Sequence, residues 1–185
     1  MNTSHDSVPT ASGYAPSITA GDFAHAVTAG RYAHAATTGA YAHATAAGGF
    51  AHATTTGYSA HATTTGYSAH ATTTGQRAHA TATGGHAHAT ATGGHAHATT
   101  TGNDAHALTA GFLSNASVSG ANSIAVAVGA NSAARAADGG FIVLAQYNHD
   151  GDTVVAVKTA QVGKDGIKPD TWYTLSPTGE FVEVD

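Results

Sequence analysis

Histidine returns at every ninth position of the chain from His25 to His106, and glycine keeps the same period from Gly21 to Gly129. One unit has the sequence GYSAHATTT, and thirteen such units follow one another without an insertion. A period that never slips is typical of repeat proteins, because each unit stacks on its neighbours and an insertion would break the stacking. A disordered Ala-Thr-Gly stalk is the alternative, but disorder needs no fixed register.

Within each unit, small side chains alternate with larger polar ones. If glycine is position one, alanine occupies position six, alanine or serine position four, and threonine, alanine or valine position eight. An alternation with period two predicts a β-strand, since successive side chains point to opposite faces. We therefore expect positions four, six and eight in a thin core and positions three, five, seven and nine outside. The glycine should form a corner with positive φ.

Nine residues suffice for one strand and one corner, so two units should complete one coil. The predicted fold class is all-β, a parallel β-solenoid or β-roll with about eighteen residues per coil over residues 21–138. Such a rod would be roughly 31 Å long at ~4.8 Å per coil. An intertwined helix of three chains would keep the same alternation and is a second interpretation.

The two ends of the array differ from the repeats. Residues 1–20, with two prolines, are expected to form an irregular leader that caps the first coil. Residues 139–185 are expected to form a small β-meander cap of four strands, the first two joined through an Asp-Gly turn. Its predicted core consists of Phe141, Val143, Val155, Val157, Trp172, Leu175, Phe181 and Val184.

Composition argues against several classes of function. The 185 residues include no cysteine, so the chain can form neither disulfides nor thiolate metal sites. A net charge of −5, with only 9% charged residues, argues against nucleic-acid binding. There is no run of about 18 apolar residues and no signal peptide, so we expect no membrane insertion and favour a phage particle or a bacterial surface. No nucleophile stands out with a dedicated base, so no enzymatic activity is expected.

The histidines raise the question of metal binding. In an eighteen-residue coil alternate units stack, so each face should carry a column of five histidines. Zinc, nickel, copper or iron would suit a patch in which imidazole and carboxylate groups meet. The predicted patch contains His70, His86, His88, Asp104 and His106, and a second patch contains His79, His95 and His97. Plain stacking of neutral imidazoles is the simpler interpretation.

Threonines and aromatic residues suggest further surfaces. Six consecutive units contain Thr-x-Thr, and threonine ranks on flat solenoids resemble those of antifreeze and ice-nucleation proteins. That resemblance implies ice binding through Thr54, Thr56, Thr72, Thr74, Thr90 and Thr92. Threonine also favours strands for steric reasons, which needs no ligand. Near the start, position three is aromatic and could contact a partner or shield the first coils, at Phe23, Tyr32, Tyr41 and Phe50.

Residues 120–136, GANSIAVAVGANSAARA, resemble the head repeats of trimeric autotransporter adhesins. The whole layout is also similar to nonapeptide-repeat proteins of bacteria and their prophages. These resemblances imply a structural or surface-binding role and favour a homotrimer. A surface glycan or a protein is the receptor expected for such a surface. The sequence thus predicts a non-enzymatic structural or adhesive rod that presents histidine and threonine arrays. Binding of a divalent transition metal and ice binding are the two alternatives.

Overall fold

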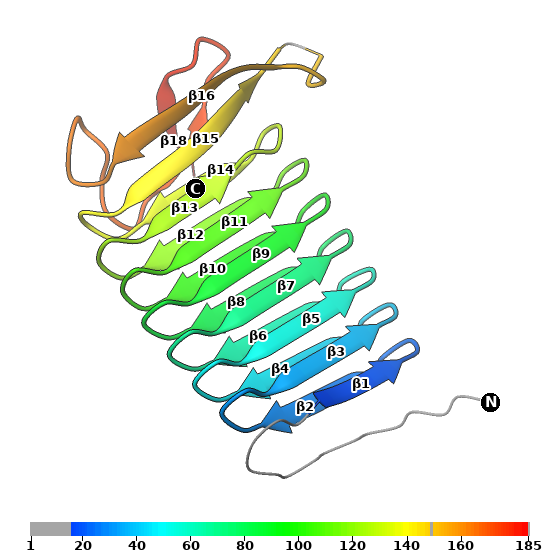
Figure 1. Ribbon diagram of the computed structural model, residues 1–185. Coiled ribbons are helices and arrows are strands. Elements are labelled where there is room, and N and C mark those ends of the chain that lie inside the picture. The colour runs from blue at the N-terminus through cyan, green and yellow to red at the C-terminus, as the bar shows by residue number, and fades with distance from the viewer. Residues whose placement is uncertain (1–15, 149, 185) are drawn as a thin grey trace.

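The computed structural model describes residues 16–148 and 150–184, whose regular secondary structure is entirely β. Eighteen strands form two nine-stranded sheets, and in each sheet the strands follow one another along the axis of a rod (Figure 1). From β1 to β15 and from β2 to β14, strands two apart in chain order pair with each other, so alternate units enter opposite sheets. The chain is therefore a parallel β-solenoid, and one chain, rather than three, makes each coil.

We call the two sheets the odd sheet and the even sheet. The odd sheet consists of β1 (Pro16–Ala20), β3 (His34–Thr38), β5 (His52–Thr56), β7 (His70–Thr74), β9 (His88–Thr92), β11 (His106–Ala110), β13 (Ile124–Ala127), β15 (Phe141–Tyr147) and β16 (Val154–Gln161). The even sheet consists of β2 (His25–Ala29), β4 (His43–Ala47), β6 (His61–Thr65), β8 (His79–Thr83), β10 (His97–Thr101), β12 (Asn115–Ser119), β14 (Ala133–Ala136), β17 (Trp172–Leu175) and β18 (Phe181–Val184).

The register of the sheets follows the predicted coil. Each parallel pair of repeat strands joins residues eighteen positions apart, for example Ala71 with Ala89. Strand β1 pairs with β3 in the same register, so the last five residues of the predicted leader, Pro16–Ala20, belong to the solenoid. The remainder of the predicted leader lies outside the described residues.

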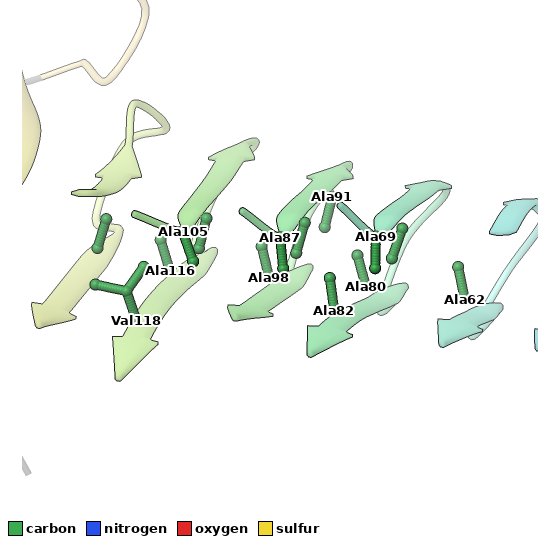
Figure 2. Packing of buried hydrophobic residues seen from close by; sticks show 14 of the residues in the cluster. Ala62, Ala69, Ala80, Ala82, Ala87, Ala91, Ala98, Ala105, Ala116 and Val118 are labelled. Atoms are coloured by element: carbon green, nitrogen blue, oxygen red, sulfur yellow. The ribbon is translucent and has the colours of Figure 1, made fainter. Parts of the chain in front are cut away.

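Small side chains from both sheets fill a thin interior. Ala69 and Ala71, at positions four and six of one unit, are 0% and 1% exposed, and Figure 2 shows such alanines projecting between the sheets. Burial alternates along β5, β6 and β7 as predicted, with inward alanine and threonine and outward histidine and threonine. Because methyl groups occupy little volume, the sheets can approach closely enough to exclude water.

Inward threonines at position eight leave their hydroxyls without partners. Eight buried threonine side chains have an Oγ1 atom with no hydrogen bond, namely Thr19, Thr28, Thr37, Thr55, Thr64, Thr73, Thr100 and Thr109. Val118 occupies position eight in a later unit and is equally buried, so a valine fits this place. The methyl group of threonine packs in the core, whereas its hydroxyl loses its hydrogen bonds to water.

Thr73→Val is therefore expected to stabilise the protein. The substitution keeps the shape of the side chain and removes a buried hydroxyl that has no partner, which is worth about 1 kcal/mol in the free energy of unfolding. The midpoint of denaturant unfolding should rise. Thr72→Val, at the exposed neighbouring position, is the matched control and should change stability by less than about 0.5 kcal/mol. A loss of stability in Thr73→Val would mean that the hydroxyl is hydrogen-bonded, for instance to buried water.

The C-terminal strands are antiparallel, as predicted, but they do not form a separate meander. Strand β15 continues the odd sheet by pairing in parallel with β13, and β16 then pairs antiparallel with β15. Strand β17 adds antiparallel to β14 of the even sheet and pairs with β18. Each hairpin thus extends one sheet of the rod, and the cap shares the solenoid core.

Most of the residues predicted to form the core of the cap lie on the outward faces of its strands or are only partly buried. Phe141 pairs with the outward Ile124, so it is 41% exposed, whereas the next residue, Ile142, pairs with the buried Ala125 and is fully buried. Val155 and Val157 are more than half exposed, Val184 is exposed, and Val143 and Trp172 are half-buried. Leu175 and Phe181 are also half-buried, but they pack against the core as predicted. The buried side chains are Ile142, Leu144, Val162, Ile167 and Tyr173. The alternation within β15 does not show which of its faces points inward. Its pairing with β13 of the solenoid determines this.

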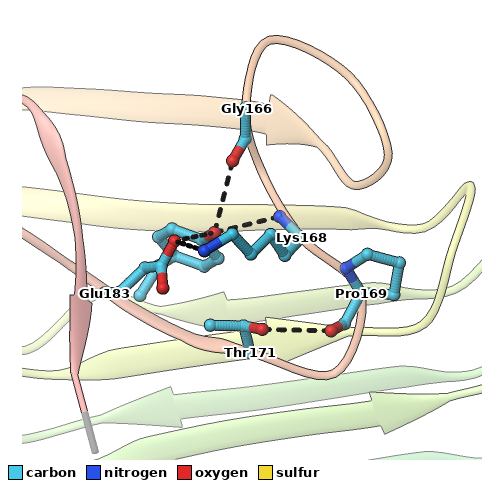
Figure 3. Close-up of polar contacts among 6 residues, drawn as sticks. Gly166, Lys168, Pro169, Thr171 and Glu183 are labelled. Atoms are coloured by element: carbon cyan, nitrogen blue, oxygen red, sulfur yellow. Dashed lines mark hydrogen bonds and ion pairs between the residues drawn. The ribbon is translucent and has the colours of Figure 1, made fainter.

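Polar contacts hold the loop between the two hairpins against β17 and β18 (Figure 3). The Tyr173 hydroxyl accepts a hydrogen bond from the Lys168 backbone N–H at 2.9 Å. The Lys168 ammonium lies 2.7 Å from the Glu183 carboxylate. Both charged side chains are about half exposed, so this ion pair contributes little to stability. The buried Tyr173 ring, at 2% exposure, anchors the loop.

Candidate functional site: the histidine and threonine faces

Each sheet carries one column of five stacked histidines on its outer face. The even ladder contains His25, His43, His61, His79 and His97, and the odd ladder contains His34, His52, His70, His88 and His106. Ring centroids in the middle of each ladder are 4.7 Å apart and nearly parallel, as for His61 and His79. The strand register imposes this spacing, so the two predicted columns are confirmed.

Stacking has an electrostatic consequence. Burial first, and then the neighbouring imidazole of His79, lowers the pKa of His61 below its ordinary value of 6.5. The same two causes, burial before histidine neighbours, lower the pKa of six other ladder residues, which are His43, His52, His70, His79, His88 and His97. At neutral pH these seven histidines are therefore mostly uncharged, and acid should charge them at a cost to the fold.

Threonines form two further columns beside each ladder. On the odd sheet Thr54, Thr72 and Thr90 are direct register partners, and the other three predicted residues follow two positions later, at Thr56, Thr74 and Thr92. All six side chains are exposed or half-exposed. In the next coil Leu108 takes the place of the threonine, so the full ranks are only three coils deep. Ice binding by these ranks stays a prediction.

The predicted metal patch is only partly assembled. His70, His88 and His106 lie in one ladder. His86 and Asp104, at position three of their units, were expected to continue the outward face of the strands, which is wrong, because both occupy turns. The two turns also differ in backbone conformation. The His86 N–H donates to Tyr67 in the preceding coil, whereas Asp104 has a φ of 55° and its N–H donates to Ala121 in the following coil.

The remaining contacts of these side chains are to aromatic rings. His86 packs edge-on against Tyr67 at 4.9 Å, and His88 is tilted by 56° relative to His106. In the second patch, His79 and His97 stack in the even ladder, while His95 lies in a turn and contacts Phe112 at 6.3 Å. Within residues 16–148 and 150–184, no group of three or more acidic or histidine side chains is placed to hold a metal ion. Metal binding therefore stays a prediction.

Aromatic residues line the two edges of the rod, where the chain turns. Phe23 stacks on Tyr41 at one edge, with centroids 5.1 Å apart, and Tyr32 stacks on Phe50 at the other, at 5.2 Å. The ring faces therefore cover one another, which favours the interpretation that they shield the first coils. Two tyrosines at position two also lie at these edges. Tyr58 packs edge-on against Tyr41, and Tyr67 packs edge-on against His86. The aromatic pattern at position three does not include them.

One apolar surface was not predicted. Outward residues of β11, β13, β15 and β16, with Val128 just after β13, form an apolar patch on the odd sheet, made of Leu108, Ile124, Val126, Val128, Phe141, Val143 and Val157. The same coils of the even sheet are polar, with Asn115, Ser117 and Arg135 facing outward. The signal was present in the sequence as IAVAV followed by FIVLA, but the outward face of FIVLA could not be assigned without its pairing with β13.

No protein-family model, curated protein or solved structure matches the chain, so the class of the protein rests on its fold, a repeat β-solenoid. None of the described segments is a helix that could cross a membrane.

Proposed function

We propose that the chain is a non-enzymatic structural rod that associates with further copies of itself. The observation that carries this proposal is the unbroken ladder of parallel strands from β1 to β15 in the odd sheet and from β2 to β14 in the even sheet. Every repeat is held by hydrogen bonds to the coils before and after it, which makes an extended and stiff body.

The apolar patch is the proposed contact with a second copy. Parallel sheets are usually covered on both faces, yet the outer face of the odd sheet is bare in the single chain. Its central residues Val126 and Val143 are apolar, and the parallel strands of this sheet, from β1 to β15, contain no Asp, Glu, Lys or Arg. The outer face of the even sheet instead carries Arg135, so it is the less suitable of the two for burial.

The area of the outer face of the odd sheet favours a partner that covers the whole length of the rod. The patch alone covers about 19 Å by about 16 Å, or roughly 300 Å², at ordinary strand spacing. Stable interfaces bury about 600–1,000 Å² on each partner, so the patch alone is too small. The whole odd face, nine strands wide, offers roughly 600–700 Å². A second copy laid along this face, with patch against patch, has the required length and composition.

This arrangement leaves the even face, with its histidine ladder and threonine ranks, open to the surroundings. A phage particle or a bacterial surface is the proposed setting. The resemblance of residues 120–136 to trimeric adhesin heads supports an assembly of three chains, and two chains would satisfy the same contact.

Native mass spectrometry of the untagged chain tests the proposal. We expect a dimer or trimer at micromolar concentration, and Val126→Lys should reduce it to the monomer without lowering the melting temperature. Thr99→Lys, at the equivalent position of the even face, is the matched control and should keep the assembly. A wild-type monomer, or equal assembly of the Val126→Lys variant, would rule the contact out. Spectra with added zinc, compared with His88→Ala, test metal binding by the ladder in the same experiment.

A further inference from the structure

Two adjoining hollows lie where the repeats end and the hairpin of β17 and β18 begins. The smaller has a volume of about 330 Å³ and is lined by Asn115, Asn131, Ala133, Trp172, Thr174, Leu175 and Val184. The larger, of about 700 Å³, shares Asn131, Thr174 and Leu175 with it and extends between the two hairpins towards Phe112 and Tyr147. The two volumes lie in the range of small-molecule sites.

The smaller hollow has a specific origin in the sequence. Ala133 stands at position five, where ten other units carry histidine. It pairs with Asn115 on one side, and on the other the pairing of Ala134 with Tyr173 brings β17 alongside. A methyl group in the place of an imidazole leaves space between Asn115 and Thr174, and the hollow, which Trp172 also lines, includes that space.

The polar groups of the hollow are free to bind a ligand. The side-chain amides of Asn115 and Asn131 make no hydrogen bond to any other described residue, and each offers two donors and one acceptor. Asn131 is held in the left-handed conformation, with a φ of 54°, at a fixed turn of the rod. The Thr174 hydroxyl is already used, since it donates to the Ser132 carbonyl at 3.0 Å.

The aromatic wall is fixed in place. The guanidinium of Arg135 lies 4.7 Å from the centre of the Trp172 ring and donates through Nε to the Ser117 hydroxyl at 2.9 Å. A cation held over the ring restrains the indole. No acidic or basic side chain lines the smaller hollow, so a charged ligand would find no counter-charge there.

We propose that these hollows bind a neutral saccharide. A sugar ring presents an apolar face of C–H groups and an edge of hydroxyls that both donate and accept hydrogen bonds. Trp172 and Leu175 can pack against the apolar face of the sugar, and the two free amides can hydrogen-bond to its hydroxyls. The larger hollow continues past Asn131, so the ligand class is an oligosaccharide with one unit in the smaller hollow. This binding is independent of the association of rods through the odd face.

Trp172 is the only tryptophan of the chain, so its fluorescence reports directly on the site. We would titrate the full chain with neutral trisaccharides built from glucose, mannose, galactose and N-acetylglucosamine, and probe it on an array of neutral and acidic glycans. We expect a saturable change in emission, protection from acrylamide quenching, and a Kd on the order of 1 mM or lower for at least one neutral glycan.

Two variants make the test specific. Ala133→His restores the residue that other repeats carry at this position, so the fold should tolerate it, and it should weaken binding at least about tenfold by filling the hollow. Ala47→His, at an exposed alanine of the same sheet, should leave binding unchanged. The proposal fails if no neutral glycan binds, if only acidic glycans or peptides bind, or if Ala133→His binds as tightly as the wild type.

Discussion

Gly93→Ala is expected to disrupt the middle of the rod. A Cβ atom at Gly93 would lie 2.2 Å from the carbonyl oxygen of Gly75 in the preceding coil, and the backbone already has a φ of +131°. Two backbones held together by a continuous hydrogen-bond ladder cannot separate at one point without losing neighbouring bonds. We expect the free energy of unfolding to fall by about 4 kcal/mol or more, with loss of a single cooperative transition. Denaturant unfolding followed by circular dichroism measures this.

Gly21→Ala separates the steric clash with the neighbouring coil from the strain of a positive φ. Gly21 has the same φ of +131°, but no described atom lies within 4 Å of the position that its Cβ would take, because it belongs to the first coil. It should cost only the conformational strain of about 1–2 kcal/mol. Gly85→Ala, in the middle of the rod, would meet only the Tyr67 ring at 3.3 Å and should be nearly neutral. Equal destabilisation by Gly93→Ala and Gly21→Ala would show that close stacking is not the reason for glycine.

Mild acid is expected to destabilise the rod through its histidine ladders. The folded state lowers the pKa of seven ladder histidines below 6.5, so the unfolded chain binds more protons than the folded chain as the pH falls. Their contribution to stability is therefore complete above about pH 6.5 and is lost as the pH falls through the folded-state pKa values. Melting temperatures from pH 8 to pH 5, at constant ionic strength, should be flat and then decline steeply.

Replacing His61, His79 and His97 with asparagine provides the control. Asn115 already occupies the next place of the same column, so asparagine is compatible with the stack. The variant should show a shallower decline between pH 6.5 and pH 5, and calorimetry should record a smaller uptake of protons on unfolding. The lowered pKa values of Asp152 and Glu183 act below about pH 4.5 and cannot produce a transition in this range. An unchanged pH profile would exclude the ladders as its source.

Residues of the repeats could be assigned from the sequence because each one has the same surroundings in every coil. The inward alanines, the outward histidines and the glycine corners were predicted from spacing, and the structure confirms the two-unit coil. His86 and Asp104 were misplaced because position three lies in the turn, where the peptide can adopt two orientations that the alternation does not distinguish. The oligomeric state, the ligands and the biological setting stay proposals.

The ends of the rod depended on the tertiary structure. An isolated strand such as FIVLAQY has two apolar faces, and pairing with β13 decides that Ile142 and Leu144, rather than Phe141 and Val143, enter the core. The hollow at Ala133 likewise exists only because β17 adds to β14 there. The sequence by itself determined the period, the coil and the inward face of every repeat, since those follow from local sterics and small side chains. Only the tertiary structure decided the cap, the apolar patch and the hollows, because these arise where strands from different units meet.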